Sequence, residues 1–224
     1  MKALLVALLL AAGLLCPCAH AQQDEATRSR FLAVEAKAKQ GDARAQYSLG
    51  VCYYDGYGVA YDFVEAVKWF RKAAEQGDAR AQFMLGVYHG NSYGVAYDLV
   101  AAVKWYRKAA EQGDADGQFN VGVCYYQGNG VEKYFVEAVY WYRKAAAQGH
   151  ARGQSMLGVC YYYGEGVRQD LMIAEAWWNL ALKTNKNAAE RRSDLEAEMS
   201  PQQVVAAQKR RKELRAIVEA KAAK

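Results

Sequence analysis

A repeat of 36 residues runs through most of this sequence. Glycines recur at that spacing at three positions of the repeat, and a tryptophan recurs at a fourth. The recurring residues are Gly41, Gly77, Gly113 and Gly149; Gly50, Gly86, Gly122 and Gly158; Gly58, Gly94, Gly130 and Gly166; and Trp69, Trp105, Trp141 and Trp177. Four consecutive units without an insertion predict an architecture in which each unit stacks on its neighbours.

Each unit reads as two helices. Asp42 is a good N-cap, and Ala45 and Leu49 follow on one face of the first helix, which Gly56 ends. In the second helix Asp62 is the N-cap, and Glu65 three residues later predicts a capping box. The buried stripe of this helix is Ala66, Trp69, Phe70, Ala73 and Ala74. One unit cannot bury a tryptophan alone, so the pattern predicts an all-α superhelix of stacked units.

The repeat also carries irregular positions. Gly50 and its equivalents lie inside a helix, where glycine costs about 1 kcal/mol relative to alanine, which predicts that two helix backbones approach closely there. Ser92 stands at the Gly56 position, so the first helix of the second unit is expected to end a turn early or to turn differently. Tyr134 replaces a capping aspartate, and His150 replaces another.

The small, aromatic and turn residues of the unit resemble the Sel-1-like repeat, a relative of the tetratricopeptide repeat with a longer turn. These residues are Ala45, Leu49, Gly50, Tyr53, Gly56, Gly58, Val59, Asp62, Ala66, Trp69, Phe70, Lys72, Ala73, Ala74 and Gly77. The resemblance covers Gly41 to about Thr184. It implies a right-handed superhelical solenoid of helix-turn-helix repeats that acts as an adaptor in protein assemblies. One subgroup staples each unit with paired cysteines, and this chain departs from it with at most one cysteine per unit.

The N-terminus has the pattern of a secretory signal peptide. Lys2 precedes an apolar run of 13 residues, and Ala19-His20-Ala21 offers a cleavage site before Gln22. A spanning helix needs about 20 residues, so an uncleaved anchor is the weaker alternative, and no later segment is apolar enough to span a membrane. The predicted organisation is a signal peptide (1–21), an N-terminal capping helix (22–40), four repeats (41–76, 77–112, 113–148 and 149–184) and C-terminal capping helices (185–224).

The positive charge belongs to the C-terminal segment. Residues 22–182 carry 17 Lys and Arg against 18 Asp and Glu, whereas residues 183–224 carry 11 against 6. A helix predicted to start at Ser200-Pro201 contains the basic patch Lys209, Arg210, Arg211 and Lys212. This patch is either a solvated helix face, which we favour, or a weak contact to an anionic surface. A short basic block without interleaved aromatics does not predict nucleic-acid binding.

Residue types suited to chemistry are sparse. Cys52, Cys124 and Cys160 occupy one repeat position, typically ~10 Å apart in a solenoid, whereas a disulfide needs Cα atoms within about 7 Å. We interpret them as packed hydrophobes, with a redox or metal role as the minority interpretation. His89 and His150 lie at no metal-ligand spacing. The sequence lacks the common nucleophile motifs, so we expect no enzyme activity, no metal and no cofactor.

The remaining candidate site is a surface. On the first helix of each unit, positions 44, 48, 52 and 55 and their equivalents face away from the buried stripe, and they vary while the scaffold repeats. We expect a concave binding groove there. The candidate residues are Arg44, Ser48, Arg80, Met84, Tyr88, Asp116, Asn120, Arg152, Met156 and Tyr163.

Three functions follow, in order of preference. The first is an exported scaffold, periplasmic or secreted, that binds a protein or peptide in the cell envelope. The second is an envelope-surface protein that docks on anionic lipid or cell-wall polymer through the basic C-terminal helix. The third is a weak hydrolase.

Overall fold

The computed structural model describes residues 25–181 and 186–222, and in these ranges it contains helices and no strand. This confirms the all-α fold. The predicted signal peptide and its cleavage site lie outside the described residues. The first described helix covers residues 25–39. The others are α2 (Ala43–Asp55), α3 (Phe63–Glu75), α4 (Ala79–Asn91), α5 (Leu99–Glu111), α6 (Ala115–Gln127), α7 (Phe135–Ala147), α8 (Ala151–Tyr163), α9 (Leu171–Ala181), α10 (Lys186–Glu198) and α11 (Pro201–Ala222).

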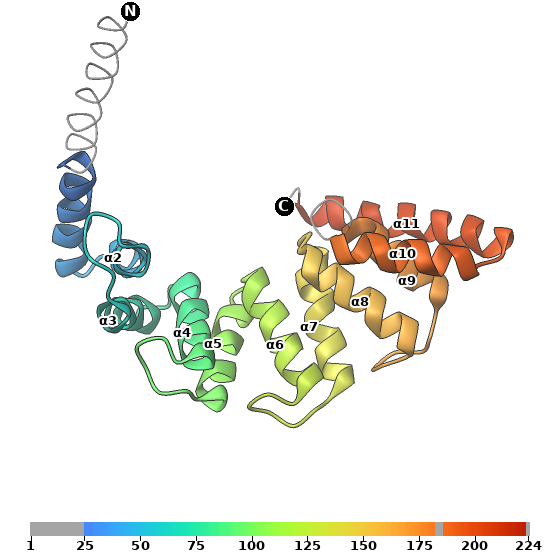
Figure 1. Cartoon of the computed structure of the whole chain (residues 1–224), viewed down its shortest axis with the longest axis horizontal. Coiled ribbons are helices and arrows are strands. Elements are labelled where there is room, and N and C mark those ends of the chain that lie inside the picture. Colours follow the sequence, from blue (N-terminus) through green and yellow to red (C-terminus); the bar gives the residue numbers. More distant parts are fainter. Residues whose placement is uncertain (1–24, 182–185, 223–224) are drawn as a thin grey trace, which may run out of the picture. The chain divides into compact units, whose positions relative to one another are not determined.

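The chain divides into two compact units. One ends at Ala81 and includes Tyr93–Ala96, and the other comprises Gln82–Ser92 and the chain from Tyr97 onward. In the first unit α2 packs against α3. In the second unit α6 packs against α7 and α8 against α9 (Figure 1). Tandem helix pairs are therefore the building block, as the 36-residue repeat predicts. None of the described helices is both long and apolar enough to cross a membrane.

The second helix of a repeat starts at a side-chain cap. The Asp62 carboxylate accepts a hydrogen bond from the N–H of Glu65 at 2.9 Å. The Glu65 carboxylate pairs with Lys68. The N–H of Asp62 donates instead to the carbonyl of Tyr53 at 3.0 Å. Only one of the two hydrogen bonds of the predicted capping box is therefore present. The backbone N–H of Asp62, which the second bond would use, is satisfied by the preceding helix.

Tyr134 leaves α7 without a side-chain cap, as predicted from the sequence. Its backbone has the same extended conformation as Asp98, which caps α5. Replacing Tyr134 with aspartate should therefore restore a cap without moving the backbone, and stabilise the chain by about 1 kcal/mol. Urea unfolding measures the change. Tyr134→Asn should stabilise the chain by the same amount as Tyr134→Asp. An unchanged urea midpoint for both variants would contradict the prediction.

The first helices end in a left-handed residue. Gly56, Gly128 and Gly164 take this role at φ between 70° and 80°. In α4 the same position is Ser92, at φ 59°. The helix α4 has 13 residues, as α2 has, so the expectation of a helix one turn shorter is wrong. Ser92 instead adopts a backbone that costs a non-glycine residue about 1–2 kcal/mol.

The glycine inside each first helix makes room for an aromatic ring. A Cβ at Gly50 would lie 2.6 Å from the ring of Phe70, which is fully buried. The same contact recurs in the pairs Gly86–Tyr106, Gly122–Tyr142 and Gly158–Trp178. A second helix backbone was expected at this place. The structure corrects the cause, because a ring from the second helix of the same repeat fills the space.

The innermost aromatic of each repeat is the residue after the recurring tryptophan. Phe70 and Tyr142 are fully buried. Trp69 and Trp105 are only half-buried, whereas Trp141 is buried. The tryptophan position is therefore a boundary between core and surface, and its burial differs between repeats.

A buried glutamine of the first helix bonds to the preceding helix in three of the repeats. The Nε2 of Gln118 donates to the carbonyl of Ala110 at 3.2 Å, and its Oε1 accepts from the Nε2 of Gln148 at 2.8 Å. Gln46 and Gln154 donate in the same way to the helix before them. Because a buried amide without partners is costly, these bonds fix how consecutive helices stack. This glutamine recurs every 36 residues, but its role was not predicted from that signal.

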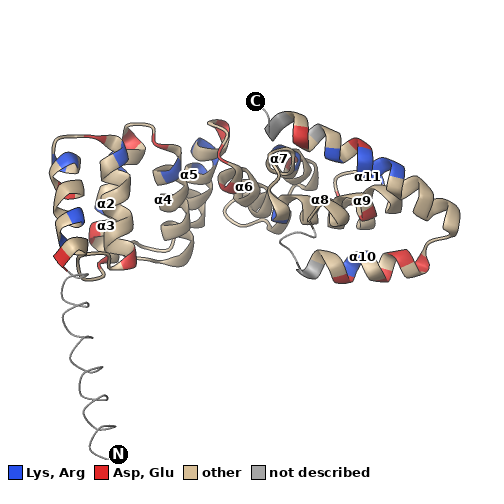
Figure 2. Cartoon of the chain, turned by 90° about the horizontal axis from the view of Figure 1, so that it is seen from above, with Lys and Arg blue, Asp and Glu red and all other residues tan. Residues whose placement is uncertain are grey.

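Two C-terminal helices close the second unit. Both α10 and α11 pack against α9, on opposite sides of it (Figure 2). The N–H of Ser200 donates to the Oε1 of Gln203 at 2.8 Å, and the N–H of Gln203 donates to the Oγ of Ser200 at 3.3 Å. These reciprocal bonds form a capping box, and the helix starts at Pro201, which confirms the predicted start. Ala207 of α11 is buried in the same apolar cluster as Trp178 of α9.

Candidate functional site

We define the first-helix face by positions 44, 48, 52 and 55 of the first repeat and their equivalents. In all four repeats the first, second and fourth of these positions are exposed or half-buried, and the third is buried. The accessible residues are Arg44, Ser48 and Asp55; Arg80, Met84 and Asn91; Asp116, Asn120 and Gln127; and Arg152, Met156 and Tyr163. These side chains change in charge and size from repeat to repeat.

Tyr88 does not belong to the accessible face. It occupies the third position, and its side chain is fully buried. It was predicted as a binding residue because the helical period puts it on the outer side of α4. Neighbouring elements cover this position in every repeat, so the structure removes Tyr88 from the candidate site.

The three cysteines share this covered position and are free and buried. Burial raises the pKa of the Cys124 thiol to about 11 and that of the Cys160 thiol to about 12. Burial, followed by the charge of Asp55, also raises the pKa of Cys52. A thiol with a raised pKa is a poor nucleophile and a poor metal ligand at neutral pH. These residues behave as small packing groups.

In the first unit, Arg80 is held by two neighbours. Its guanidinium pairs with the carboxylate of Asp78 at 2.6 Å and lies over the ring of Tyr47, 4.3 Å from the centroid. Burial alone would raise the pKa of Asp78, but the hydrogen bonds from Arg80 and from the N–H of Ala81 outweigh it and lower that pKa. The side chain of Arg80 stays 48% exposed. A fixed, charged and accessible guanidinium can bind a carboxylate of a partner.

The second unit has an equivalent arrangement at Arg152. This guanidinium lies over the ring of Phe119, 5.0 Å from the centroid, and its nearest nitrogen is 3.6 Å from the carboxylate of Asp116. His150 also contacts both residues: its ring lies 4.9 Å from that of Phe119, and its Nε2 is 3.1 Å from Asp116. The Nδ1 of His150 caps α8 by accepting from the N–H of Gly153. His150 thus keeps the capping role of the aspartate that it replaces.

The aromatic rings that contact these arginines, Tyr47 and Phe119, were not predicted from the sequence. Tyr47, Phe83 and Phe119 occupy one repeat position, and this recurrence of aromatic residues could have identified the position. Tyr47 and Phe119 each precede their arginine by 33 residues. At the same distance after Phe83 the chain has Asp116 instead of an arginine. The charge at the first position of the first-helix face is therefore negative at Asp116 and positive at Arg80 and Arg152, the equivalent residues of the repeats before and after it.

The remaining predicted residues occupy different settings. Arg44 and Ser48 line a cleft of about 280 Å³ between α2 and the helix of residues 25–39. Met156 is half-buried and packs against the apolar clusters of the second unit. Tyr163 is 65% exposed, with its ring edge-on to Tyr162. The Nδ2 of Asn120 donates to the carbonyl of Asp116 within α6, which orients the amide.

The basic patch on α11 is partly neutralised. Figure 2 shows its Lys and Arg residues along the helix. Arg211 pairs at 2.5 Å with Glu175 of α9, which is 1% exposed, and Arg210 pairs with Glu213 at 2.7 Å. Lys209 and Lys212 remain exposed. The interpretation of Arg211 as part of a solvated basic face is therefore wrong, because this side chain attaches α11 to α9.

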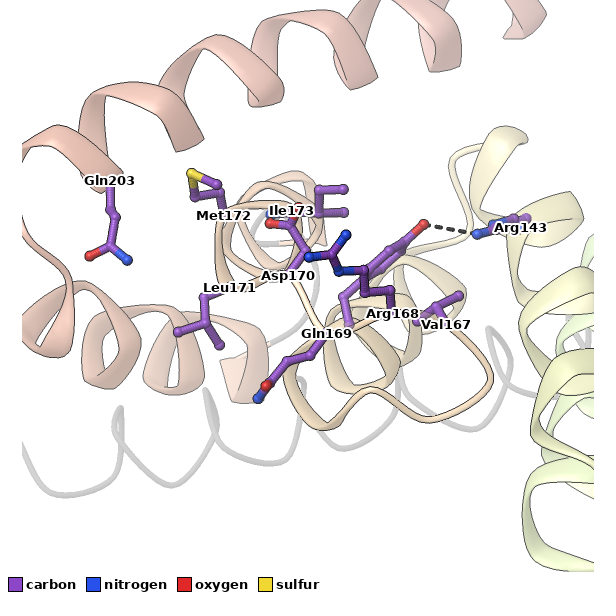
Figure 3. Close-up of a pocket in the computed structure, with 10 residues that line it drawn as sticks. Arg143, Val167, Arg168, Gln169, Asp170, Leu171, Met172, Ile173 and Gln203 are labelled. Atoms are coloured by element: carbon purple, nitrogen blue, oxygen red, sulfur yellow. Dashed lines mark hydrogen bonds between the residues drawn. The ribbon is translucent and has the colours of Figure 1, made fainter.

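A cleft of about 690 Å³ lies where α11 passes the start of α9 (Figure 3). Leu171, Met172 and Ile173 form its apolar side, Gln203 reaches it from α11, and Arg143 reaches it from α7. The guanidinium of Arg143 donates to the hydroxyl of Tyr161 at 2.9 Å. Asp170 also lines the cleft, where it caps the N–H of Ile173. The lining therefore combines an apolar side with the charged and polar groups of Arg143, Asp170 and Gln203.

Within the described ranges, no group of three or more His, Cys, Asp or Glu side chains could hold a metal ion. The aspartates that stand out in the sequence act mainly as helix caps. The arrangement can therefore bind through charge, hydrogen bonds and aromatic contacts.

Comparisons with known proteins agree with the geometry. A model of the Sel1 repeat matches residues 43–78, 79–114, 115–150 and 151–183. The crystal structure of a Sel1 repeat protein from Oxalobacter formigenes is 31% identical, with a TM-score of 0.72 over 85% of this chain and 76% of that one. No curated protein matches the sequence.

Two further solved structures resemble the chain more distantly. One is a protective antigen of uropathogenic Escherichia coli with an SLR fold, at 26% identity and a TM-score of 0.43, covering 88% of this chain and 58% of that one. The other is cysteine-rich protein B of Helicobacter pylori, at 21% identity and a TM-score of 0.47, covering 58% of this chain and 94% of that one.

Proposed function

The chain belongs to the Sel1 repeat family, and from that membership we propose that it is an exported interaction scaffold that holds a protein or peptide partner in the cell envelope. Proteins of this family typically mediate protein–protein interaction. The partner contacts the first-helix face of the repeats. The N-terminal pattern of Lys2, an apolar run and Ala19-His20-Ala21 supports export.

The observation that carries the proposal is the contrast between buried and accessible positions of the first helices. Leu49, Leu85, Val121 and Leu157 are all fully buried aliphatic residues at one position. Five residues before each of them, at the first position of the first-helix face, the chain has arginine in three repeats and aspartate in one. A scaffold that repeats its core and varies its accessible face offers specificity to one partner.

The two stacked arginines are suited to this role. An aromatic ring and a carboxylate already hold each guanidinium of Arg80 and Arg152, so less side-chain freedom is lost on binding. Arginine is enriched among the residues that dominate interface energies, where truncation commonly costs about 2 kcal/mol or more. We therefore assign Arg80 and Arg152 as principal contacts, each within its own unit.

The test is the double variant Arg80→Glu/Arg152→Glu. Immobilised chain captures partners from an envelope extract, and mass spectrometry quantifies what is retained. Because both guanidinium contacts become repulsive, retention of the dominant protein should fall at least about tenfold.

The matched control is Lys209→Glu/Lys212→Glu, which makes the same change in net charge on α11. Retention should then stay within about twofold, since these lysines lie outside the first-helix face. Equal retention of the dominant protein by the native chain and the Arg80/Arg152 variant would contradict the proposal. Loss only in the lysine variant would support docking through α11 instead, an alternative that the engagement of Arg210 and Arg211 by carboxylates makes weaker.

A further inference from the structure

Two clefts open beside the half-buried tryptophans, away from the first-helix face. In the first unit a cleft of about 500 Å³ includes Trp69 and Val95. In the second unit a cleft of about 550 Å³ includes Trp105 and Val131. Their lining residues correspond one to one at the repeat spacing. Both volumes fall within the range of about 300–1,000 Å³ that is typical of ligand sites.

The Trp105 cleft has apolar walls. Trp105 is half-buried, and Lys108 lies over its ring at 4.3 Å from the centroid. Val100 beside it is 51% exposed, and Val131 comes from the linker before α7. A large apolar side chain that entered this cleft would cover an exposed valine and the open part of the indole, and removing this apolar surface from water favours binding.

The rim of the Trp105 cleft is more basic than that of its equivalent. Lys104, Arg107 and Lys108 line it against a single carboxylate, Glu111. In the Trp69 cleft the corresponding Lys68 is paired with Glu65. Ala101 stands at the Glu65 position, so Lys104 lacks that partner. The charge at the Trp105 cleft therefore complements an acidic ligand.

The third repeat shows the same position in a closed form. Tyr140 replaces the rim lysine and packs edge-on against Trp141 at 5.2 Å between ring centroids. The Nε1 of Trp141 donates to Glu137 at 2.9 Å, and the indole is 4% exposed. The chain thus contains both an open and a filled version of one structural position.

We propose that the Trp105 cleft binds an acidic peptide segment whose large apolar side chain enters beside the indole. Carboxylates on either side of that residue face Lys104, Arg107 and Lys108. This inference rests on the proposed function, because it names the chemistry of a segment that such a scaffold recruits. It uses a surface distinct from the first-helix face.

Two synthetic peptides test the inference by fluorescence anisotropy against the full chain. One has a Leu-Phe pair flanked on each side by two acidic residues, and the other has lysines in place of the acids. The acidic peptide should bind at least about tenfold more tightly, and its affinity should fall as salt is added. Absence of measurable binding, or equal affinity for both peptides, would overturn the proposal.

Variants locate the binding. Lys104→Glu/Lys108→Glu should weaken the acidic peptide at least about tenfold. Val100→Glu should weaken it similarly, and because Val100 is half exposed this change spares the core. Lys144→Glu, at the closed third position, should change affinity less than about twofold. If Lys144→Glu weakens the peptide as much as the cleft variants do, the proposal is wrong.

Arg80→Glu/Arg152→Glu should leave affinity for the acidic peptide unchanged. That result separates the two hypotheses, because the first-helix face can fail as a partner site while the cleft still binds the peptide. A peptide that loses affinity only in the Arg80/Arg152 variant would contradict the cleft and favour the first-helix face.

Discussion

Replacing Gly158 with alanine is expected to destabilise the chain by about 3 kcal/mol, although alanine is the better helix former. A Cβ at this position would lie 2.2 Å from the Nε1 of Trp178 and 2.3 Å from its Cδ1. Trp178 is 3% exposed, and its Nε1 donates to the carbonyl of Ser155 at 3.0 Å. The indole has to move, so the variant loses packing and a buried hydrogen bond together.

The matched control is Gly90→Ala in α4. A Cβ there would meet its nearest atom at 3.7 Å, which is ordinary contact, and the backbone of Gly90 is helical. This substitution should stabilise the chain by about 0.5–1 kcal/mol. Urea unfolding followed by circular dichroism measures both. If Gly158→Ala also stabilised the chain, the ring would not be what requires glycine at this position.

Removing the side chain of Arg211 should cost about 3 kcal/mol, because it leaves the carboxylate of Glu175 buried without its cation. Glu175 is 1% exposed, and the pair joins α11 to α9. The neighbouring Arg210→Ala is the control. It breaks an exposed pair with Glu213 and should cost less than about 1 kcal/mol. Equal costs for the two variants would contradict the assigned role of Arg211.

The cost of Arg211→Ala should also depend on pH. Burial raises the pKa of Glu175, Arg211 lowers it, and Glu196 raises it. The variant loses the group that lowers this pKa, so its folded-state pKa rises further above the unfolded value. A raised folded pKa gives stability that is present at low pH and lost as pH rises. The variant should therefore be destabilised more at about pH 8 than at about pH 5.

The sequence predicted the fold because one signal repeats four times. Glycines and tryptophans in fixed register specify two helices per repeat, and no long-range information is needed. The caps at Asp62 and Ser200 were also predictable, since they depend on residues three positions apart.

Contacts between helices were less predictable than the helices and their caps. Helical period placed Tyr88 on an outer face, but the covering elements come from elsewhere in the chain. The three cysteines at the same repeat position were predicted as packed hydrophobes, and they are buried. The ring beside Gly158 and the partner of Arg211 are 20 and 36 residues away, and nothing in the local pattern identifies them. The accessibility of the first, second and fourth positions of the first-helix face was predictable, because exposure of single helix positions follows from the buried stripe.

Site-specific photo-crosslinking tests the central claim most directly. A photoreactive residue replaces Asn120 on the first-helix face, or Glu190 on α10 as the control, and each chain is irradiated in living cells. We expect Asn120 to yield one dominant crosslinked protein, and Glu190 to yield none above background. Equal crosslinking at both positions, or none at Asn120 while a chain labelled at Glu190 captures the partner, would contradict a protein-binding first-helix face.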